Sequence, residues 1–524
     1  MVFNTCVLCT TLVCTCTCTT PQYQAPYLDT SATRRREKNR ITSKRLCSHV
    51  HLVHTPPVSF KSISLTPTKR PRNNFAATIV NVYIVDDYIN FMLLLNSTLH
   101  NQRRIGTTFV RCLFAATTPV PPDPILGLVA RFQADTNPNA VNLAQGAYRN
   151  AQGRPFVLSS VKKAEKRIAD ELSNNQINKE YLGIEGNPAF LQASAAFAWG
   201  EIYDQIEPRV ASVQSLSGTG ALRLAADTLH QIGNVQDIWL SNPSWGNHAK
   251  IFEAAGLTTN NYQYLNPQTG TSLDFERMCH DLTHVVPDGS VVLLHACAHN
   301  PTGIDPTNSQ WDQLADVFEK KHLIPLFDSA YQGYASGNPD VDAYAIRAFS
   351  KRSNISTMLV CQSYAKNMGM YGERVGALNV LTNTPMERDA VLSQIKQKII
   401  RPMYSSPPLH GSRLANLLLT DEALNKEWLQ ELKGMATRIE GIRKELVVAL
   451  DKEEAGGGGG RSWHHITDQI GMFAYTGLSG EQVDVLLDEH GIYLTRDGRM
   501  SLAGMKSSDV DVVAKAMVEV VGKE

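Results

Sequence analysis

The order of apolar and polar segments constrains the fold of this chain more than any other feature. From Thr118 onward, apolar runs of strand length alternate with longer segments of helical spacing. In residues 291–328 the run VVLLHAC leads through a polar turn to the helical pattern WDQLADVFEKKH and then to the run LIPLFD. This order is typical of βαβ units, in which parallel strands form a sheet between helices. We therefore expect an α/β fold whose large domain has a mostly parallel sheet between helices.

The C-terminal part follows a different pattern. A long amphipathic stretch, WLQELKGMATRIEGIRKELVVAL, precedes five glycines at 456–460, which predict a flexible surface loop. The segment IGMFAYTGL then indicates a strand, and GEQVDVLLDEHG indicates a helix that ends at Gly491. We expect a smaller α+β domain here. The predicted division is a large domain at 158–433 and a small C-terminal domain at 434–524, with 114–157 forming an N-terminal arm and part of the small domain.

Residues 1–113 differ in composition from the rest. Through residue 80 the only acidic residues are Asp29 and Glu37, whereas arginine and lysine are frequent among serine, threonine and proline. An acid-poor segment rich in arginine and serine is typical of an organelle transit sequence. The uncharged start of the chain does not fit a simple amphipathic presequence, so a disordered tail and an over-extended gene model remain the alternatives for this N-terminal extension.

Composition and residue pattern argue against several classes of protein. The formal net charge of zero argues against a nucleic-acid-binding protein. No uncharged run reaches the ~18–20 apolar residues that a membrane-spanning helix needs. Cys6 and Cys9 form a Cys-x-x-Cys pair, but no second pair follows at zinc-site spacing, so we expect no metal. The isolated thiols of the globular part are typical of a reducing compartment.

Lys366 lies in the stretch QSYAKNMGMYGERVG, among uncharged residues. A neutral lysine can form a Schiff base with an aldehyde cofactor, although an exposed lysine is the commoner fate of such a residue. The segment from Ser363 to Lys366 also matches the S-x-x-K of serine β-lactamases. That mechanism requires S-D-N and K-T-G further along the chain, and neither string occurs.

The stretch QSLSGTGALRLAADTL predicts a glycine turn that leads into a helix. Such a turn can direct the backbone N–H groups of Gly218 and Thr219 at a phosphate, although in isolation an ordinary glycine turn is the better explanation. It is not a dinucleotide fingerprint, because the third glycine would fall at Arg223. A phosphate can also collect the Ser363 hydroxyl and the Arg374 guanidinium, which strengthens the interpretation.

Polar and aromatic residues follow several predicted strands. Asp328 ends an apolar strand, with Tyr331 three residues later, and Asn300 follows another strand. Ligand sites gather at the carboxyl ends of parallel strands, so Asp328 can pair with a protonated heterocycle nitrogen or simply cap the next turn. Trp245, in a polar loop, can stack on a flat ring or pack in the core.

Together these motifs resemble the aspartate aminotransferases, which are class I pyridoxal-phosphate enzymes of fold type I, and most nearly their mitochondrial isoform. The resemblance runs from about Pro122 to the C-terminus and rests on LLHACAHNPTG, CQSYAKNMGMYGERVG, IIRPMYS and HITDQIGMF. It implies a fold type I PLP-dependent transferase with pyridoxal 5'-phosphate as cofactor. The implied reaction is ping-pong transfer of the amino group of L-aspartate to 2-oxoglutarate, with small dicarboxylic amino acids and oxo acids as substrates.

The resemblance also implies roles for matching residues. Lys366 would form the Schiff base and act as the general base, and Asp328 would keep the pyridine nitrogen protonated. The implied catalytic residues are Lys366, Asp328, Tyr331 and Trp245. The implied cofactor-binding residues are Ser217, Gly218, Thr219, Trp245, Asn300, Asp328, Tyr331, Ser363, Lys366, Arg374 and Tyr181. The implied substrate-binding residues are Gly146, Trp245, Asn300, Arg401 and Arg499.

Tyr181 and Arg401 would come from the partner subunit of a homodimer with shared active sites. The two arginines, Arg499 and Arg401, would each bind one carboxylate of a dicarboxylic substrate. The implied location is the mitochondrial matrix, with the cytoplasm and the plastid as alternatives.

Two departures from the family pattern bear on substrate range. Gln145 stands where the family has a small apolar residue that borders the substrate, and Ser406 replaces an asparagine near the arginine that binds the distal carboxylate. Neither change removes a reacting group. Both predict an effect on affinity, and Gln145 predicts an effect on the choice among dicarboxylates.

Overall fold

The computed structural model describes residue 114 and residues 117–457 and 460–522, all within the unit of residues 112–524. The predicted N-terminal extension at 1–113, with its Cys6–Cys9 pair, lies outside the described residues. Gly458 and Gly459 of the predicted glycine loop also lie outside them. Within the described part of the chain, no helix has the length and apolar character needed to cross a bilayer.

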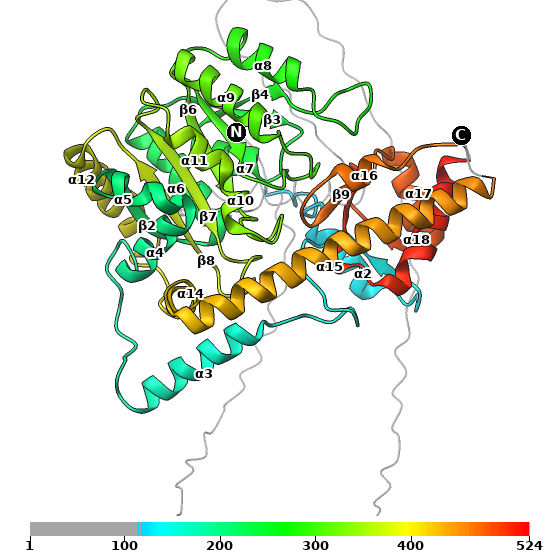
Figure 1. The fold of residues 1–524 in the computed structure, drawn as a ribbon, viewed down its shortest axis with the longest axis horizontal. Helices are drawn as coiled ribbons and strands as arrows, with labels where there is room; N and C mark the ends of the chain where they lie inside the picture. The colour runs from blue at the N-terminus through cyan, green and yellow to red at the C-terminus, as the bar shows by residue number, and fades with distance from the viewer. Residues whose placement is uncertain (1–113, 115–116, 458–459, 523–524) are drawn as a thin grey trace, which may run out of the picture. The chain divides into compact units, whose positions relative to one another are not determined.

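A seven-stranded sheet forms the centre of the fold (Figure 1). Its strands, in spatial order, are β2 (Val210–Leu216), β8 (Val375–Leu381), β7 (Met358–Ser363), β6 (Ile324–Ser329), β5 (Val291–His295), β3 (Asp237–Asn242) and β4 (Thr258–Gln263). The strand β8 runs antiparallel to β2 and β7, and every other neighbouring pair is parallel. The prediction of an α/β fold with a mostly parallel sheet is therefore confirmed.

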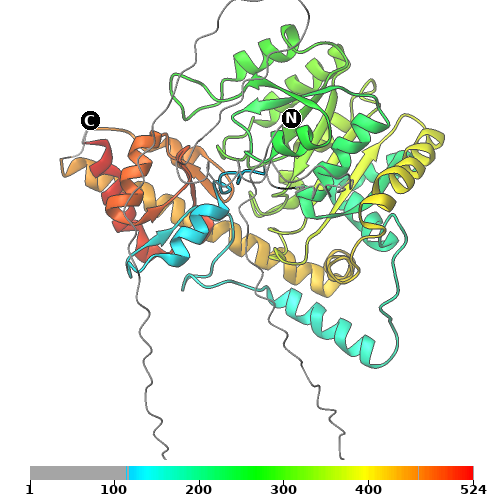
Figure 2. The ribbon, with the colours of Figure 1, turned by 180° about the vertical axis from the view of Figure 1, so that it is seen from behind.

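Helices cover both faces of this sheet (Figure 1, Figure 2). One face packs against α4 (Pro188–Trp199), α5 (Tyr203–Ile206), α8 (Phe275–His284), α9 (Asn308–Lys321) and α11 (Tyr344–Ser350). The other packs against α6 (Ser217–Gln231), α7 (His248–Ala254) and the π-helix η3 (Ile395–Ile400). Successive side chains of a strand point to opposite faces, so Val292 of β5 enters the first core and Leu293 the second.

A third core joins the long helix α15 (Glu422–Ala455) to the terminal segments. It includes side chains from α3 (Ser159–Ser173), α14 (His410–Thr420), α17 (Gly480–His490) and α18 (Ser507–Val521). Two small sheets complete this region: β1 (Val141–Asn142) pairs in parallel with β10 (Ile492–Tyr493), and β9 (Phe473–Tyr475) pairs antiparallel with β11 (Arg499–Ser501). The strand predicted in IGMFAYTGL is therefore confirmed as β9.

Local sequence signals explain where several helices begin and end. A capping box of Thr307 and Gln310 starts α9, and a second one of Ser479 and Gln482 starts α17. The predicted end of α17 at Gly491 is confirmed, because Gly491 has a positive φ of 66° and caps the helix. The shorter helices are α2 (Leu126–Ala134), η1 (Gly200–Ile202), η2 (Glu207–Arg209), α10 (Pro339–Asp342), α12 (Pro385–Gln394), α13 (Arg401–Tyr404), α16 (His465–Asp468) and η4 (Leu502–Gly504).

Candidate active site

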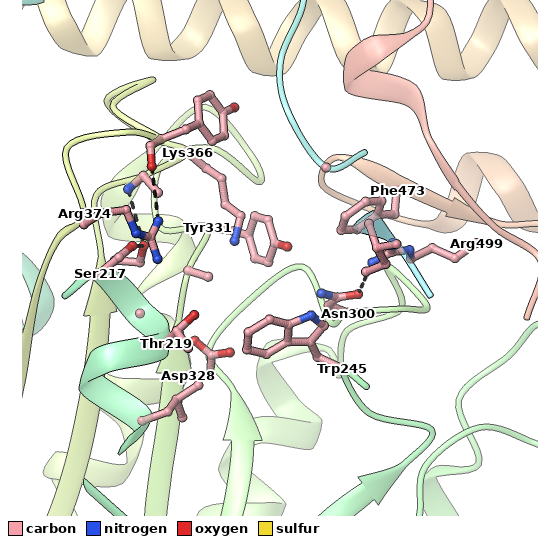
Figure 3. A pocket seen from close by; sticks show the side chains of 18 residues that line it. Ser217, Thr219, Trp245, Asn300, Asp328, Tyr331, Lys366, Arg374, Phe473 and Arg499 are labelled. Carbon is pink, nitrogen blue, oxygen red and sulfur yellow. Dashed lines mark hydrogen bonds between the residues drawn. The ribbon is translucent and has the colours of Figure 1, made fainter. Parts of the chain in front are cut away.

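A cavity of about 210 Å³ lies where β6 and β7 end and α6 begins (Figure 3). The carboxyl ends of neighbouring parallel strands meet at one edge of a sheet, which explains why residues far apart in sequence gather here. Most of the predicted site residues line this cavity: Gly146, Ser217, Gly218, Thr219, Trp245, Asn300, Asp328, Tyr331, Ser363, Lys366, Arg374 and Arg499.

Lys366 lies in the loop that follows β7, and its amine faces the cavity (Figure 3). Two hydrogen bonds of the next residue, Asn367, hold this loop in place. Its Nδ2 donates to the carbonyl of Gln332 (3.1 Å), and its backbone carbonyl accepts from Trp428 Nε1 (2.8 Å). Burial lowers the pKa of Lys366 to about 8, against the opposing effect of the Asp328 carboxylate. A substantial fraction of the amine is therefore neutral near physiological pH, as a nucleophile or proton acceptor requires.

Asp328, in β6, is held as an anion beside the cavity. Burial alone would raise its pKa. The hydrogen bond from His248 and the electrostatic interactions with His248, His295 and Lys366 outweigh burial and lower the pKa. His248 Nε2 donates to Asp328 Oδ2 at 3.1 Å, and its Nδ1 lies 2.8 Å from Ser244 Oγ. A buried carboxylate kept ionised in this way can stabilise a positive charge on a bound ligand.

Hydroxyl groups and an arginine surround the N-terminus of α6. Ser217 Oγ lies 3.1 Å from Ser363 Oγ, and Thr219 and Arg374 line the same end of the cavity. A Cβ on Gly218 would lie 3.1 Å from Ser363 Cβ, so glycine allows the helix start and the end of β7 to approach closely. A helix N-terminus with hydroxyls and a guanidinium is suited to a phosphate group.

The positive φ of two non-glycine residues marks the same region. Ser217 has φ of 62° and Arg374 has φ of 52°, in the left-handed region that side chains seldom adopt. Strain of this kind persists where the surrounding structure holds the backbone, and it is frequent at functional sites. Arg374 Nη1 also donates to the carbonyl of Tyr371 at 3.2 Å.

Arg499 lies at the opposite end of the cavity, in β11. Its side chain is buried, and it donates to Asn300 Oδ1 (3.1 Å) and to the carbonyl of Ala144 (3.3 Å). The guanidinium also lies 4.3 Å from the centre of the Phe473 ring. Burial lowers the pKa of Arg499, although the group stays charged at physiological pH. Neither hydrogen bond joins it to a carboxylate, so its charge is available to an anionic ligand.

Four of the residues considered from sequence lie elsewhere, among them Ser406, which is half-buried just beyond α13. Tyr181 is 92% exposed, and Arg401 is exposed at the start of α13, where its Nη1 donates to Ser405 Oγ. Neither lines the cavity within this single chain. Gln145 Oε1 accepts from Arg149 Nη2 at 3.3 Å, and its side chain lines a neighbouring cavity of about 310 Å³.

Sequence reasoning did not identify several residues that shape the cavity. His248 stands three residues after Trp245, and Tyr371 lies within the stretch that contains Lys366, but neither was assigned a role. Phe473 was interpreted only as part of a strand. Each acts through a partner far along the chain, such as Asp328 for His248, so the only signal in the sequence was proximity to an assigned residue.

Comparison with known proteins agrees with this geometry. The family model for aminotransferase class I and II matches residues 138–517. A mitochondrial aspartate aminotransferase of Dictyostelium discoideum is 48% identical over 401 residues, which cover 76% of this chain and 91% of the relative. A mitochondrial aspartate aminotransferase of Xenopus tropicalis is 48% identical over 402 residues, with the same coverage.

Solved structures give the same result. The cytoplasmic aspartate aminotransferase of Saccharomyces cerevisiae matches with a TM-score of 0.74 and 42% identity, over 78% of this chain and 98% of that one. An aromatic-amino-acid aminotransferase of Burkholderia pseudomallei, covalently bound to pyridoxal phosphate, matches with a TM-score of 0.72 and 38% identity, over 78% and 99% of the two chains. The chain therefore belongs to the class I and II aminotransferases.

Proposed function

We propose that this chain is a transaminase that uses pyridoxal 5'-phosphate to move the amino group of L-aspartate to 2-oxoglutarate, giving oxaloacetate and L-glutamate. The observation that carries the proposal is a single cavity in which the Lys366 amine, with a pKa of about 8, shares space with the Asp328 carboxylate and the buried Arg499 guanidinium. The relatives named aspartate aminotransferase, at 46–48% identity, support the same reaction.

The residues of the cavity fit this cofactor. Ser217, Thr219, Ser363 and Arg374 supply hydroxyls and a positive charge for the phosphate at the start of α6. Asp328, kept ionised by His248, matches a protonated pyridine nitrogen. The cofactor supplies an aldehyde carbon and an electron-accepting ring. Trp245 offers a flat surface for the ring, and Tyr331 and Asn300 offer polar groups for its phenolic oxygen.

The chain's own residues account for the remaining chemistry. Arg499 binds the α-carboxylate of the amino acid, which fixes the Cα–H bond relative to Lys366. The neutral Lys366 amine would act as the general base that accepts the Cα proton of the amino acid, and its protonated form would return that proton; such proton transfers contribute ~10²–10⁴ in rate. Asp328 would keep the ring nitrogen of the cofactor protonated, since an adjacent carboxylate favours the charged form. Burial around Lys366 keeps the amine neutral often enough to act.

Activity is tested directly with purified protein. We expect oxaloacetate from aspartate and 2-oxoglutarate, with parallel lines in double-reciprocal plots as ping-pong kinetics require. Borohydride reduction of the holoenzyme should place the cofactor on the peptide that contains Lys366. Label on another peptide, or Lys366→Ala with undiminished turnover, would refute the assignment.

Substrate preference needs its own measurement, because solved structures of similar fold include a broad-specificity aminotransferase of Leishmania mexicana at 40% identity. We expect aspartate to exceed phenylalanine in kcat/KM, since two arginines match two carboxylates. A preference for phenylalanine would favour the alternative of a transaminase shifted to other amino acids.

We infer that the enzyme acts as a homodimer in which Tyr181 and Arg401 serve the site of the other subunit. Their exposure in a single chain supports this inference. Subunit mixing provides the test: Lys366→Ala should be inactive and Arg401→Ala about 10²-fold weaker toward aspartate, but a hybrid dimer would contain one site with both residues intact. Activity should therefore return on mixing, and a mixture that stays inactive despite subunit exchange would exclude shared sites.

We propose that the mature enzyme resides in the mitochondrial matrix. The acid-poor N-terminal composition and the mitochondrial relatives support this location. Import of the tagged full-length chain, followed by N-terminal sequencing of the imported product, would test it. Retention of the whole chain in the cytoplasm, or import into plastids, would contradict it.

A further inference from the structure

Arg443, in the middle of α15, is a buried cation. Its side chain is only 3% exposed, and burial lowers its pKa to about 10, with partial opposition from the charge of Glu440. Within the described residues, no ion pair joins Arg443 to a carboxylate. A buried cation without a carboxylate is unfavourable unless its N–H groups are well satisfied.

Three backbone carbonyls satisfy this guanidinium, and all belong to one short segment. Nη1 donates to the carbonyl of Ile466 (3.1 Å), and Nη2 donates to the carbonyls of Gly471 (2.6 Å) and Phe473 (2.9 Å). The guanidinium presents its donors in a fixed planar fork, so it fixes the relative positions of the carbonyls it binds. Arg443 therefore joins three points of the segment 466–473.

The opposite side of the same segment contacts the loop that carries Asn300. The N–H of Ile470 donates to the carbonyl of Gly303 at 2.7 Å. A Cβ on Gly471, which has a positive φ of 84°, would lie 2.4 Å from Ala298 Cβ. The segment is thus held between α15 and the loop after β5, with little room to move.

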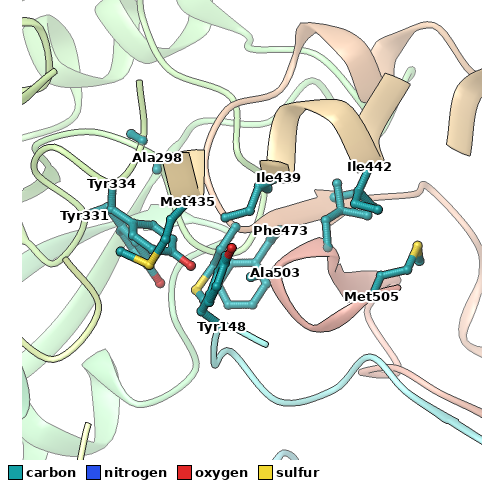
Figure 4. Close-up of a cluster of buried hydrophobic side chains, with 14 of the residues drawn as sticks. Tyr148, Ala298, Tyr331, Tyr334, Met435, Ile439, Ile442, Phe473, Ala503 and Met505 are labelled. Atoms are coloured by element: carbon teal, nitrogen blue, oxygen red, sulfur yellow. The ribbon is translucent and has the colours of Figure 1, made fainter. Parts of the chain in front are cut away.

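The segment ends at Phe473, whose ring contacts both sides of the predicted carboxylate site. Its centre lies 4.3 Å from the Arg499 guanidinium, within the range of a cation–π interaction. A Cβ on Gly146 would lie only 2.8 Å from Phe473 Cζ, so the ring packs directly on the backbone there. Figure 4 shows Phe473 beside Tyr148 and below Ile439 of α15.

We infer that Arg443 is a positioning residue for substrate recognition: by binding the carbonyls of residues 466–473 it sets the Phe473 ring, and the ring in turn orients Arg499 for the substrate carboxylate. This inference rests on the proposed function, because it concerns how that site recognises its substrate. Arg443 itself does not line the cavity.

Binding of succinate to the holoenzyme tests the inference without turnover, because succinate has two carboxylates and no amino group. We expect Arg443→Lys and Phe473→Leu each to weaken succinate about tenfold by calorimetric titration and to raise KM for aspartate similarly, with kcat changed less than threefold. Lysine keeps the charge but cannot bind three carbonyls at once. Arg209→Lys is the control, because Arg209 also donates to a backbone carbonyl, that of Thr382 (3.4 Å), but does not line the cavity. It should leave the succinate affinity within twofold.

The double variant separates positioning from general support of the fold. If Arg443 acts through Phe473, Arg443→Lys should weaken succinate less than twofold further in the Phe473→Leu background. Independent, multiplying effects would overturn the inference, as would a lower melting temperature with unchanged succinate affinity. Should Arg443→Lys not fold, Phe473→Leu alone still decides, because unchanged affinity removes the proposed link. Wild-type protein without transaminase activity would instead count against the proposed function.

Discussion

The two arginines predicted to bind substrate carboxylates lie in opposite environments. Arg499 is 4% exposed, with its guanidinium fixed by Asn300, by the Ala144 carbonyl and by the Phe473 ring. Arg401 is exposed, and its hydrogen bond within the chain is to Ser405, four residues away. One half of the predicted substrate site is therefore preorganised in a single chain, whereas Arg401, predicted for the other half, is exposed there.

The backbone around each arginine differs in the same sense. Arg499 belongs to β11, where the backbone is constrained by pairing with β9 and by the burial of all three strand residues. Arg401 follows the π-helix η3 directly, and Ser405 beyond it has a positive φ of 68°. Such π-helical turns and strained residues are frequent at functional sites. At this irregular backbone the Arg401 side chain is exposed to solvent and is not packed in the core.

The largest expected effect comes from removing the buried member of the pair. Arg499→Ala should lower kcat/KM for aspartate by about 10²–10⁴, since loss of one partner of a buried charge costs about 3–5 kcal/mol. Phenylalanine should suffer equally, because it shares the α-carboxylate. Arg499→Lys keeps the positive charge but loses the planar guanidinium fork, so its kcat/KM should lie between those of the wild type and Arg499→Ala. Steady-state kinetics with both amino acids measure this, and a loss below tenfold would contradict the predicted role.

Removing the exposed arginine should have a smaller and selective effect. Arg401→Ala should lower kcat/KM for aspartate by about 10², the scale of one lost charge-assisted interaction, and leave phenylalanine within threefold. The melting temperature should stay constant, because an exposed side chain contributes little to stability. Equal losses for the two substrates would show that Arg401 does not read the distal carboxylate.

The site was predictable from sequence where chemistry lies at strand ends. Asp328 and Lys366 follow apolar strands directly, and the carboxyl ends of parallel strands converge, so their meeting follows from the fold. The link from Arg443 to Phe473 was not predictable, because backbone carbonyls leave no sequence signature. Gln145 was expected to border the substrate, yet it turns to Arg149. A position in a motif does not determine where a side chain points.

The cavity that contains Arg499 can also be examined through the Lys366 amine, which lines it. In the apoenzyme, Lys366 should be acetylated by acetic anhydride with a midpoint near pH 8, below the usual 10.5. The Asp328 charge raises the pKa of Lys366, so Asp328→Asn should lower that pKa further and increase the labelling rate at pH 7 about three- to tenfold. Peptide mapping by mass spectrometry gives the rate at Lys366. Slower labelling of Lys366 in Asp328→Asn would mean that the Asp328 charge does not raise the pKa of Lys366, and it would contradict the electrostatic account.

A similarly small effect is expected for Tyr371, whose hydroxyl accepts from the N–H of Tyr148 at 2.9 Å. This bond joins the loop of Lys366 to the loop whose Ala144 carbonyl holds Arg499. Tyr371→Phe leaves that N–H without its partner, which costs about 1–3 kcal/mol when buried and less when water reaches it. We therefore expect a three- to tenfold rise in KM for aspartate, with kcat within twofold.

Double variants relate this bond back to the two arginines. Tyr371→Phe should couple to Arg499→Lys, because both act on the same loop, and the combined loss should be smaller than the product of the single losses. It should be independent of Arg401→Ala, because Arg401 bonds to Ser405 and does not line the cavity. The free energies from kcat/KM of the four variants in each cycle measure both couplings. Coupling to Arg401 as strong as to Arg499 would mean that the exposed arginine, too, is positioned by the interior of its own chain.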